Sequence, residues 1–367
     1  MFSKRWLHQN GSINFNRITF IQSLIITIVN PQPMYRVGDL LFIKIVAIDS
    51  EGRQKSYGGD FLRTKLYSKY PVQASTSGIV TDYGNGTYIS RFLLSWPGHL
   101  SLSVKLIHSS EAVQVLKKIR EKFLRRLMKC SFLQKGSNVS EWVPCTFNIN
   151  KSLNLRDVCD FSKPLINVTF HCQRPTSSPC DSLSMCIRDQ QRTNKLFKPV
   201  FARNNESNTT LHYQFHHFPL NQAKPISVND LYYVAERIDS IIGGPNVVII
   251  LGLWGHYTAE PIETFRSRVY GVRRAIERMH RRYPDTKVIW RTSNVRDHVR
   301  FFHFVENSDW YAHELMLEGQ KILQGVNISI IDVWDMSESM WHEPIMHPPE
   351  DVVENHINML LSYICPL

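Results

Sequence analysis

The residues with the clearest chemical potential lie near the C-terminus, in the stretch ISIIDVWDMSESMWHEPIMHPPEDVVENHINMLLSYIC at 328–365. The apolar run from Ile328 to Val333 predicts a buried strand, and Asp332 and Asp335 stand at its C-terminal end. His347 follows after a loop. Active sites of open α/β sheets form at the carboxyl ends of strands, so an acid and a histidine there could be two thirds of a hydrolase triad.

His347 has two interpretations. It precedes two prolines and could simply cap the helix predicted from Glu350 to Tyr363. As a general base it would need a carboxylate to orient its ring. Asp335 and Asp332 are the candidates for that carboxylate, with Glu343 behind them.

The elements that must position these residues fill the second half of the chain. Predicted helices over 231–242, 263–282 and 310–323 alternate with predicted strands over 247–253, 287–291 and 328–334. This alternation predicts a parallel sheet with helices on both faces, so the loops after the three strands should meet at one edge. The first two loops carry Gly252, His256 and Asn294, which could help to stabilise an oxyanion.

Two predicted helices are rich in basic residues. The inner stripe of the helix over 263–282 is Phe265, Val269, Val272, Ile276 and Met279, and arginines cover its outer face. The inner stripe of the helix over 111–129 is Val115, Ile119, Phe123 and Leu127. The lysines and arginines of this second helix form either a solvated face on a connecting helix or a surface that docks on a polyanionic glycan or a membrane.

The segment over 23–109 alternates in hydropathy and contains turn signals every ten or so residues. Strands at this spacing predict an immunoglobulin-like sandwich, here without the cysteine pair that pins the two sheets of many such domains.

Six of the seven cysteines fall between Cys130 and Cys186, and Cys365 stands almost at the end of the chain. None forms a CxxC pair, which disfavours a zinc ribbon and favours a disulfide cluster in a secretory protein. The odd number predicts that one thiol is free or pairs between chains. The region over 130–200 lacks periodicity and is expected to be rich in loops.

Three histidines, His212, His216 and His217, lie close together in the next segment. They could hold a metal if the segment were helical, but the aromatic residues around them alternate as on an exposed strand face. We therefore expect a strand and no metal site.

Composition indicates the class of partner. The net charge of +11 calls for an acidic partner, and anionic glycans or glycoproteins fit the other features better than nucleic acid. Glycosylation sequons occur at positions that include Asn85, Asn138, Asn167 and Asn208. No run of apolar residues predicts a transmembrane segment. The N-terminus shows no signal peptide, so we expect that the start of a longer secretory chain is missing.

Several motifs resemble those of the NXPE family (neurexophilin and PC-esterase domain proteins). They are YGGDFLR at 57–63, NGTY at 85–88, LIHSSEA at 106–112, VRRAIER at 272–278, IIDVWDM at 330–336 and the HPP that begins at His347. The likeness covers most of the chain from about residue 20, except for a junction near 187–203.

This resemblance implies the domain order. After a tail at 1–20 come a neurexophilin-type immunoglobulin-like sandwich at 21–110, a basic linker helix at 111–129, a cysteine-rich region at 130–203 and an SGNH/GDSL-like PC-esterase domain at 204–367. The resemblance also implies a protein of the Golgi or one that is secreted. Its implied activity is acetyl transfer or ester hydrolysis on the hydroxyls of sialylated glycans, with a serine nucleophile in a Gly-Asp-Ser motif. No resident cofactor is expected, although acetyl-CoA could serve as acyl donor.

The sequence departs from the family at the nucleophile. It contains no Gly-Asp-Ser, and the first strand of the esterase sheet is expected to be missing as well. The tetrad from Cys180 to Leu183 has cysteine in place of glycine, and no strand is predicted before it, so we interpret Ser182 as part of a structural or disulfide-bearing loop. Many SGNH enzymes carry an aspartate ahead of the catalytic histidine in a D-x-x-H motif, but Pro344 stands at that aspartate position here.

Three hypotheses follow for function. The first is an NXPE-type protein whose glycan O-acetyltransferase or esterase activity is impaired by loss of the serine. The second is a non-enzymatic secreted ligand or glycan-binding protein that acts on a cell-surface receptor through its neurexophilin-like domain. The third is a splice product that does not fold.

Overall fold

The computed structural model describes residues 15–122, 128–147, 157–188, 200–214, 216, 225–296, 298, 301–340 and 348–365. The chain divides into two compact units. The first contains Met1–Lys122, Arg291–Glu314 and Ile330–Leu367, and the second contains Phe123–Trp290 and Leu315–Ser329. Strand β17 (Lys287–Arg291), helix α5 (Asp309–Leu323) and strand β18 (Ser329–Ile331) cross this division.

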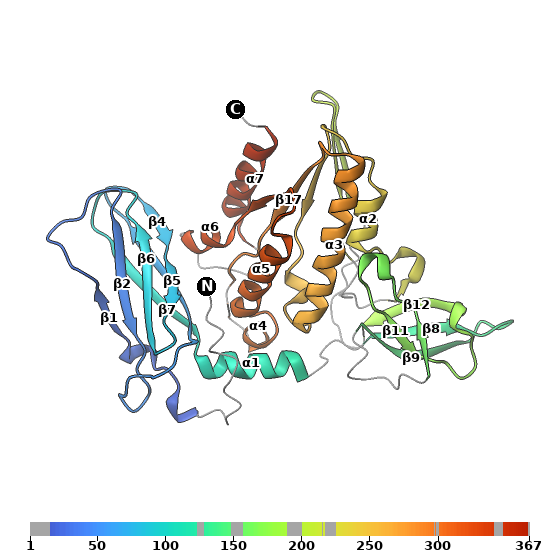
Figure 1. Ribbon diagram of the computed structural model, residues 1–367, viewed down its shortest axis with the longest axis horizontal. Coiled ribbons are helices and arrows are strands. Elements are labelled where there is room, and N and C mark those ends of the chain that lie inside the picture. The colour runs from blue at the N-terminus through green and yellow to red at the C-terminus, as the bar shows by residue number, and fades with distance from the viewer. Residues whose placement is uncertain are drawn as a thin grey trace. The chain divides into compact units, whose positions relative to one another are not determined.

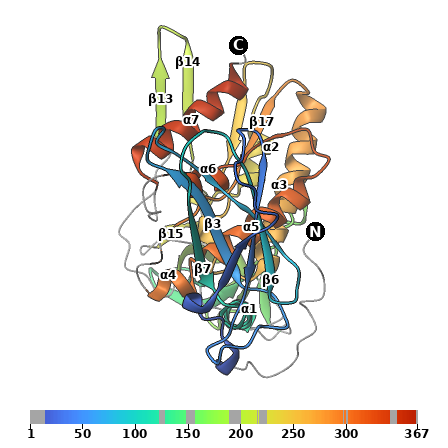
Figure 2. The same ribbon diagram turned by 90° about the vertical axis from the view of Figure 1, so that its left-hand side faces the viewer.

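The first unit begins with two short turns, η2 (Phe15–Arg17) and η3 (Ile21–Ser23), and continues as two antiparallel sheets. One sheet has the order β1-β2-β6-β5, built from Ile25–Ile28, Leu40–Val46, Thr87–Leu93 and Ile79–Asp82. The other has the order β4-β3-β7, built from Ala74–Ser77, Phe61–Ser68 and Ser101–His108. Figures 1 and 2 show these strands as layered sheets.

A single apolar core lies between these two sheets. Alternate residues of β2, among them Ile43 and Ile45, are buried together with Tyr88 of β6 and with Leu62 and Leu66 of β3. Because both sheets contribute to one core, the predicted β-sandwich is confirmed. Its immunoglobulin-like topology stays a prediction.

Buried polar contacts connect the loops of the sandwich. Lys55 Nζ lies 2.8 Å from Glu111 Oε1, and the Tyr57 hydroxyl donates to the same oxygen over 2.5 Å. Asp60 Oδ1 accepts a hydrogen bond of 2.7 Å from the backbone N–H of Ser110. The segments YGGDFLR and LIHSSEA, on which part of the resemblance depends, are therefore joined inside the sandwich.

Helix α1 (Ser110–Lys122) follows directly and buries a different face from the predicted one. Val113, Leu116 and Arg120 are buried, whereas the predicted Val115 and Ile119 are only half-buried. Packing on aromatic residues of α5 sets this rotation of the helix, because Val113 and Leu116 share a core cluster with them. Phe123 and Leu127 lie outside the described residues. The first unit also holds α4 (Phe301–Val305), α6 (Trp334–Ser339) and α7 (Glu350–Ile364).

In the second unit, the expectation of a loop-rich cysteine region was wrong. An antiparallel sheet of order β10-β11-β9-β8-β12-β15 is built from Val158–Asp160, His171–Gln173, Ser140–Thr146, Met128–Leu133, Leu183–Arg188 and Ile226–Ser227. Two further short turns, η5 (Pro164–Ile166) and η6 (Cys180–Ser182), lie between its strands. The strands are short, and several pair with strands that are distant in sequence, so local periodicity does not predict them.

Three disulfides cross-link this region, as the cysteine pattern predicts. Cys130 pairs with Cys186 and Cys145 with Cys172, each between residues directly opposite on neighbouring strands. The third bond joins Cys159 and Cys180. Cys365 is exposed and free, which accounts for the odd number.

The α/β elements of the second unit are η7 (Val228–Asp230), α2 (Val234–Ser240), β16 (Val248–Leu251), η8 (Gly255–Tyr257), α3 (Ile262–Arg282) and β17 (Lys287–Arg291). Strand β16 pairs in parallel with β17, and β18 is the third strand of that sheet. The predicted inner stripe of α3 is buried along its whole length. Helices on both faces of the sheet, and an SGNH-type topology, stay predictions.

A separate hairpin of β13 (Val200–Asn204) and β14 (Thr209–Tyr213) precedes these elements (Figure 2). All of its residues are exposed, and His212 lies on it, so the strand predicted here is confirmed for 209–213. Among the described residues, no helix has the length and apolar character needed to cross a membrane.

Candidate functional site

Asp332, one of the two predicted carboxylates, joins the ends of two strands within the first unit. Its Oδ1 accepts hydrogen bonds from the Thr292 hydroxyl at 3.1 Å and from the backbone N–H of Trp334 at 3.0 Å. Thr292 Oγ1 in turn accepts from the backbone N–H of Val333 at 2.9 Å. These bonds hold the start of α6 against the end of β17, so Asp332 has a positioning role in the fold.

Asp335, the preferred partner of His347, lies in the first turn of α6. Partial desolvation and the neighbouring Asp332 carboxylate raise the pKa of Asp335, although its side chain keeps contact with solvent and a hydrogen bond with Ser77 acts in the opposite direction. His347 lies outside the described residues. The catalytic pairing of Asp335 with His347 therefore stays a prediction.

Sequence reasoning missed His313, a titratable group close to this acidic pair. Its ring centroid lies 5.5 Å from that of Phe61 and 5.1 Å from that of Trp334. Desolvation lowers the pKa of His313 to about 4, and the charge of Asp332 opposes that shift. The imidazole is therefore neutral at pH 7. His313 lies on α5, four residues after the start of the helix. Nothing in the sequence distinguishes it there from an ordinary core residue.

Asn294 does not present the free amide that an oxyanion site needs. The side chain is buried, its Oδ1 accepts from Arg291 at 3.1 Å, and its Nδ2 donates to the carbonyl of Val295 at 2.9 Å. Arg291 also lies 3.4 Å from His356 Nδ1. Burial lowers the pKa of Arg291 to about 10, so this cation persists at neutral pH.

Gly252 and His256 lie in the second unit, whereas Asn294, Asp332 and Asp335 lie in the first. Gly252 is exposed, and a Cβ there would meet no atom within 4 Å, so no close approach requires a glycine. His256 is half-buried in η8, and its Nδ1 lies 3.2 Å from His216 Nε2. His216 belongs to the histidine-rich segment considered above for metal binding.

The described residues do not complete a metal site around these two histidines. Within them, the one group of three metal-type ligands is Cys130, Cys145 and Cys172, and all three are disulfide-bonded. His217 lies outside the described residues.

Ser182 is held in a turn that does not suit a nucleophile. It ends η6, whose first residue, Cys180, is bonded to Cys159. The Ser182 hydroxyl donates to the carbonyl of Pro179 at 2.7 Å. A nucleophile elbow places its serine on a sharp turn directly after a buried strand. The residues before η6 form bends, so the interpretation as a disulfide-bearing loop agrees with the geometry.

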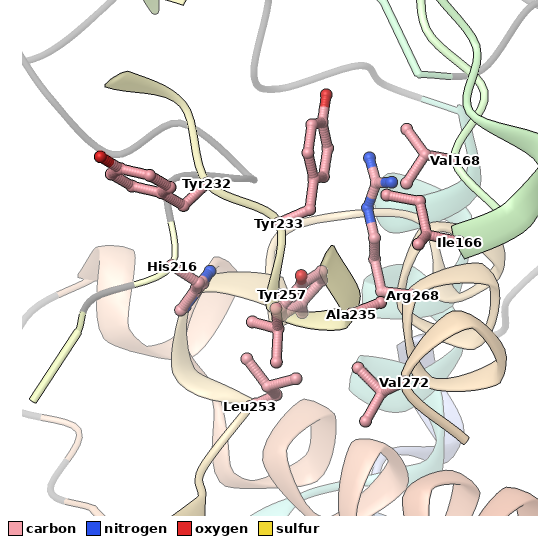
Figure 3. A pocket seen from close by; sticks show the side chains of 11 residues that line it. Ile166, Val168, His216, Tyr232, Tyr233, Ala235, Leu253, Tyr257, Arg268 and Val272 are labelled. Atoms are coloured by element: carbon pink, nitrogen blue, oxygen red, sulfur yellow. The ribbon is translucent and has the colours of Figure 1, made fainter. Parts of the chain in front are cut away.

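A small pocket in the second unit is lined by Arg268, whose position was predicted incorrectly from the sequence. Figure 3 shows Arg268 among apolar and aromatic side chains that include Ile166, Tyr233 and Tyr257. Arg268 was expected on the outer face of α3 but is buried. The sequence feature that could have indicated this burial is the position of Arg268 three residues after Phe265, which places it at the edge of the buried stripe.

The predicted glycosylation sites differ in access. Asn85, Asn138 and Asn208 are exposed. Asn167 is half-buried, and its Nδ2, the atom that would carry the sugar, donates to the carbonyl of Ser267 at 3.0 Å. The geometry therefore favours modification of the first three and argues against Asn167.

Comparison with protein families agrees with the organisation described above. Residues 20–214 match the family model described as Neurexophilin, and residues 181–365 match the one described as NXPE family member 4-like, C-terminal domain. The first match spans the sandwich and the disulfide-linked sheet up to the hairpin, and the second spans the α/β elements. Because each match covers at least half of the chain, this protein belongs to the NXPE family.

Proposed function

We propose that this chain is a secretory-pathway protein that binds anionic glycans, and that its family-level chemistry on sialylated glycans is impaired. That chemistry would be O-acetyl transfer or ester hydrolysis through a serine acyl-enzyme. The NXPE family and the three disulfides support the secretory pathway. Golgi residence and secretion both stay proposals.

The observation that carries the loss of chemistry is the environment of Ser182. The family implies a serine in a Gly-Asp-Ser motif, and the nearest equivalent here begins with Cys180 instead of glycine. Its hydroxyl donates to a backbone carbonyl, and none of the histidines that the structure describes is among its hydrogen-bond partners. An acyl-enzyme needs a base within hydrogen-bond reach of the nucleophile.

Charge supports an anionic partner for the remaining binding role. The net charge of +11 favours association with polyanions, and such association weakens as salt screens the charges. Binding needs no nucleophile, so it survives the loss of the Gly-Asp-Ser segment.

The chemical part of this proposal is tested with acetyl-CoA as donor and a sialylated oligosaccharide as acceptor. The full chain and a His347→Ala variant are incubated in parallel, and the acetylated acceptor is measured by mass spectrometry. We expect equal, background levels from both. Transfer by the full chain above the level of the variant would show an active enzyme and overturn the proposed impairment.

The binding part is tested with immobilised glycoprotein before and after sialidase treatment. We expect retention on the untreated surface, loss after desialylation and weaker retention at high salt. Retention that is unchanged by sialidase would remove the case for sialylated glycans.

A second candidate function is that of a ligand for a cell-surface protein, and strand β1 favours it. All four residues of β1 are exposed, three of them are isoleucines, and the strand lies at the edge of its sheet. An exposed apolar edge strand can pair with a strand of another protein. Ile26→Lys in the full chain should reduce cell-surface binding, whereas Leu211→Lys on the β13–β14 hairpin should not. Equal binding by both variants would exclude the edge strand as the contact.

A further inference from the structure

The charge of Arg268 is buried without a compensating partner. Its residue is 8% exposed and lies in the N-terminal half of α3. Among the described residues it makes no hydrogen bond or ion pair, and its Nη1 is a buried donor with no acceptor. Burying a charge in this way is costly unless something pairs with it.

Three other arginines on α3 pair with carboxylates. Arg266 pairs with Glu318 at 2.8 Å, Arg273 with Glu277 at 2.9 Å and Arg278 with Asp239 at 2.6 Å. These three side chains are more exposed than that of Arg268 and have less need of compensation. Among the described residues, Arg268 is therefore an arginine of α3 that is buried and has no paired carboxylate.

The surroundings of Arg268 form a recognition pocket. The guanidinium carbon lies 4.6 Å from the ring centroid of Phe147 and 5.3 Å from that of Tyr233. Aromatic rings at these distances attract a guanidinium through cation–π contacts, which use none of its N–H donors. Figure 3 shows the group beside Tyr233 and facing Ile166 and Val168, at the border of the hollow.

The nearby titratable groups act on the pKa of Arg268 in two directions. Burial lowers the pKa of Arg268, but Tyr257, Tyr233 and Glu260 act in the opposite direction. Burial raises the pKa of Tyr233 to about 12, so this phenol is neutral at pH 7. Glu260 acts on Arg268 without forming an ion pair with it, so the guanidinium keeps its donors for a ligand.

The size of the pocket restricts the ligand group. The hollow measures about 320 Å³ out to its mouth, but its enclosed part has room for about one water-sized group. A carboxylate can place one oxygen there and leave the rest of the molecule outside. It is also planar and matches the fork of a guanidinium, whereas sulfate and phosphate are tetrahedral and bulkier.

We propose that Arg268 and this pocket bind the carboxylate of an acidic sugar, with the guanidinium donating to one carboxylate oxygen. The proposal rests on the glycan-binding function proposed above and gives it a definite site. The aromatic walls suit the apolar face of a pyranose, and the mouth leaves the sugar hydroxyls in solvent. The shared chemistry is the carboxylate, which a nonulosonic acid or a uronic acid could supply.

The test measures the binding of four methyl glycosides to the full chain by ligand-observed NMR and calorimetry. The ligands are those of N-acetylneuraminic acid, glucuronic acid, a sulfated galactose and neutral galactose. Arg268→Met is compared with Arg274→Met, which removes an exposed arginine from the same helix. We expect at least one carboxylated sugar to bind, about 10- to 100-fold more weakly to Arg268→Met and unchanged to Arg274→Met. The preferred carboxylated ligand identifies the source.

A second variant keeps the charge and reduces the space. Ala235 lines the hollow, so Ala235→Val should weaken binding while Arg268 stays in place. Without ligand, Arg268→Met should be at least as stable as the parent chain, because it removes an unpaired buried charge. A large loss of stability in Arg268→Met would mean that the arginine serves the fold, and would count against the site.

The possible failures are distinguishable. Equal affinity of the parent chain and Arg268→Met for a carboxylated sugar would overturn the Arg268 site but leave the proposed glycan-binding function. Preference for the sulfated sugar would overturn the carboxylate assignment. Binding of none of the acidic sugars would overturn both the site and the function on which it rests.

Discussion

Lys55 is fully buried, and its ammonium group lies between the hydroxyl of Ser110, at 2.7 Å, and the carboxylate of Glu111. Burial raises the pKa of Glu111, but hydrogen bonds from Lys55 and Tyr57 outweigh it and leave that pKa below its usual value. Breaking such a pair by removing one partner costs about 3–5 kcal/mol, because the other charge stays buried. The polar residues of these motifs therefore contribute to the architecture of the domain.

His108, in the same LIHSSEA segment, gives the fold a dependence on pH. It is buried against the rings of His298 and Phe304, and burial lowers its pKa to about 4. In the unfolded chain a histidine titrates near 6.5. A lowered folded-state pKa means that the neutral form stabilises the fold fully above about pH 6.5, and that this stability is lost as the pH falls toward 4.

We therefore expect the free energy of unfolding to fall between pH 7.5 and pH 5, with about 2 kcal/mol of the loss due to His108. His108→Phe keeps an aromatic ring but cannot be protonated, so its stability should change less over the same interval. Urea unfolding of both proteins at the two pH values measures the difference. Equal pH dependence in the two proteins would show that His108 is not buried as described.

The limits of sequence reasoning are clearest at single residues. Asp332 was correctly expected at the end of its strand, but its bonds to Thr292 and Trp334 could not be predicted, because the first depends on how two strands adjoin. Arg120 was expected on a basic face that is solvated or docks on a polyanion or a membrane, and Arg268 was expected on the outer face of its helix. Each is buried by aromatic residues distant in sequence, and helical periodicity contains no information about such partners.

At the scale of elements, α3 and the disulfide-linked sheet show what periodicity can predict. The stripe of α3 repeats every three or four residues over 21 residues, so the sequence defines both its length and its inner face. Strands β10 and β11 have three residues each, too few to define an alternation. Their pairing depends on long-range contacts and on cysteines whose connectivity the sequence leaves open.

Two glycines in helix interiors test the packing of these elements. A Cβ on Gly271 of α3 would lie 2.0 Å from the carbonyl oxygen of Ile166 in η5, a clash with backbone. A Cβ on Gly319 of α5 would meet Trp290 at 3.4 Å and Phe265 at 3.7 Å, which are ordinary contacts. The same substitution should therefore have opposite effects at the two positions.

Gly271→Ala should destabilise the protein by about 1–3 kcal/mol, because η5 or α3 must shift to make room. Gly319→Ala should stabilise it by up to about 1 kcal/mol, because alanine favours the helix and fits the space. Chemical denaturation monitored by circular dichroism measures both. A stabilising Gly271→Ala would contradict the contact between α3 and η5.

At the scale of the whole molecule, the disulfides compensate for short strands in the second unit. The bonds close segments of 56, 27 and 21 residues. Each cross-link of that length stabilises the folded state by about 3–4 kcal/mol, because it reduces the conformational entropy of the unfolded chain. Such a sheet depends on an oxidising compartment, which agrees with the secretory pathway proposed for this NXPE-family chain. Cysteine composition predicted the redox environment, but it could not predict which residue stays unpaired.

Counting free thiols tests whether the protein has these three disulfides with Cys365 unpaired, or a different pairing that involves Cys365. Purified protein, denatured without reductant, should react with iodoacetamide at one position, Cys365, and after reduction at all seven cysteines. Because Cys365 is exposed, it should also react in the native protein, whereas the other six should not. Modification at Cys159 or Cys180 would mean that the third bond is open. Absence of any free thiol, together with a dimer on a non-reducing gel, would mean that Cys365 pairs between chains and that the chain is secreted as a covalent dimer.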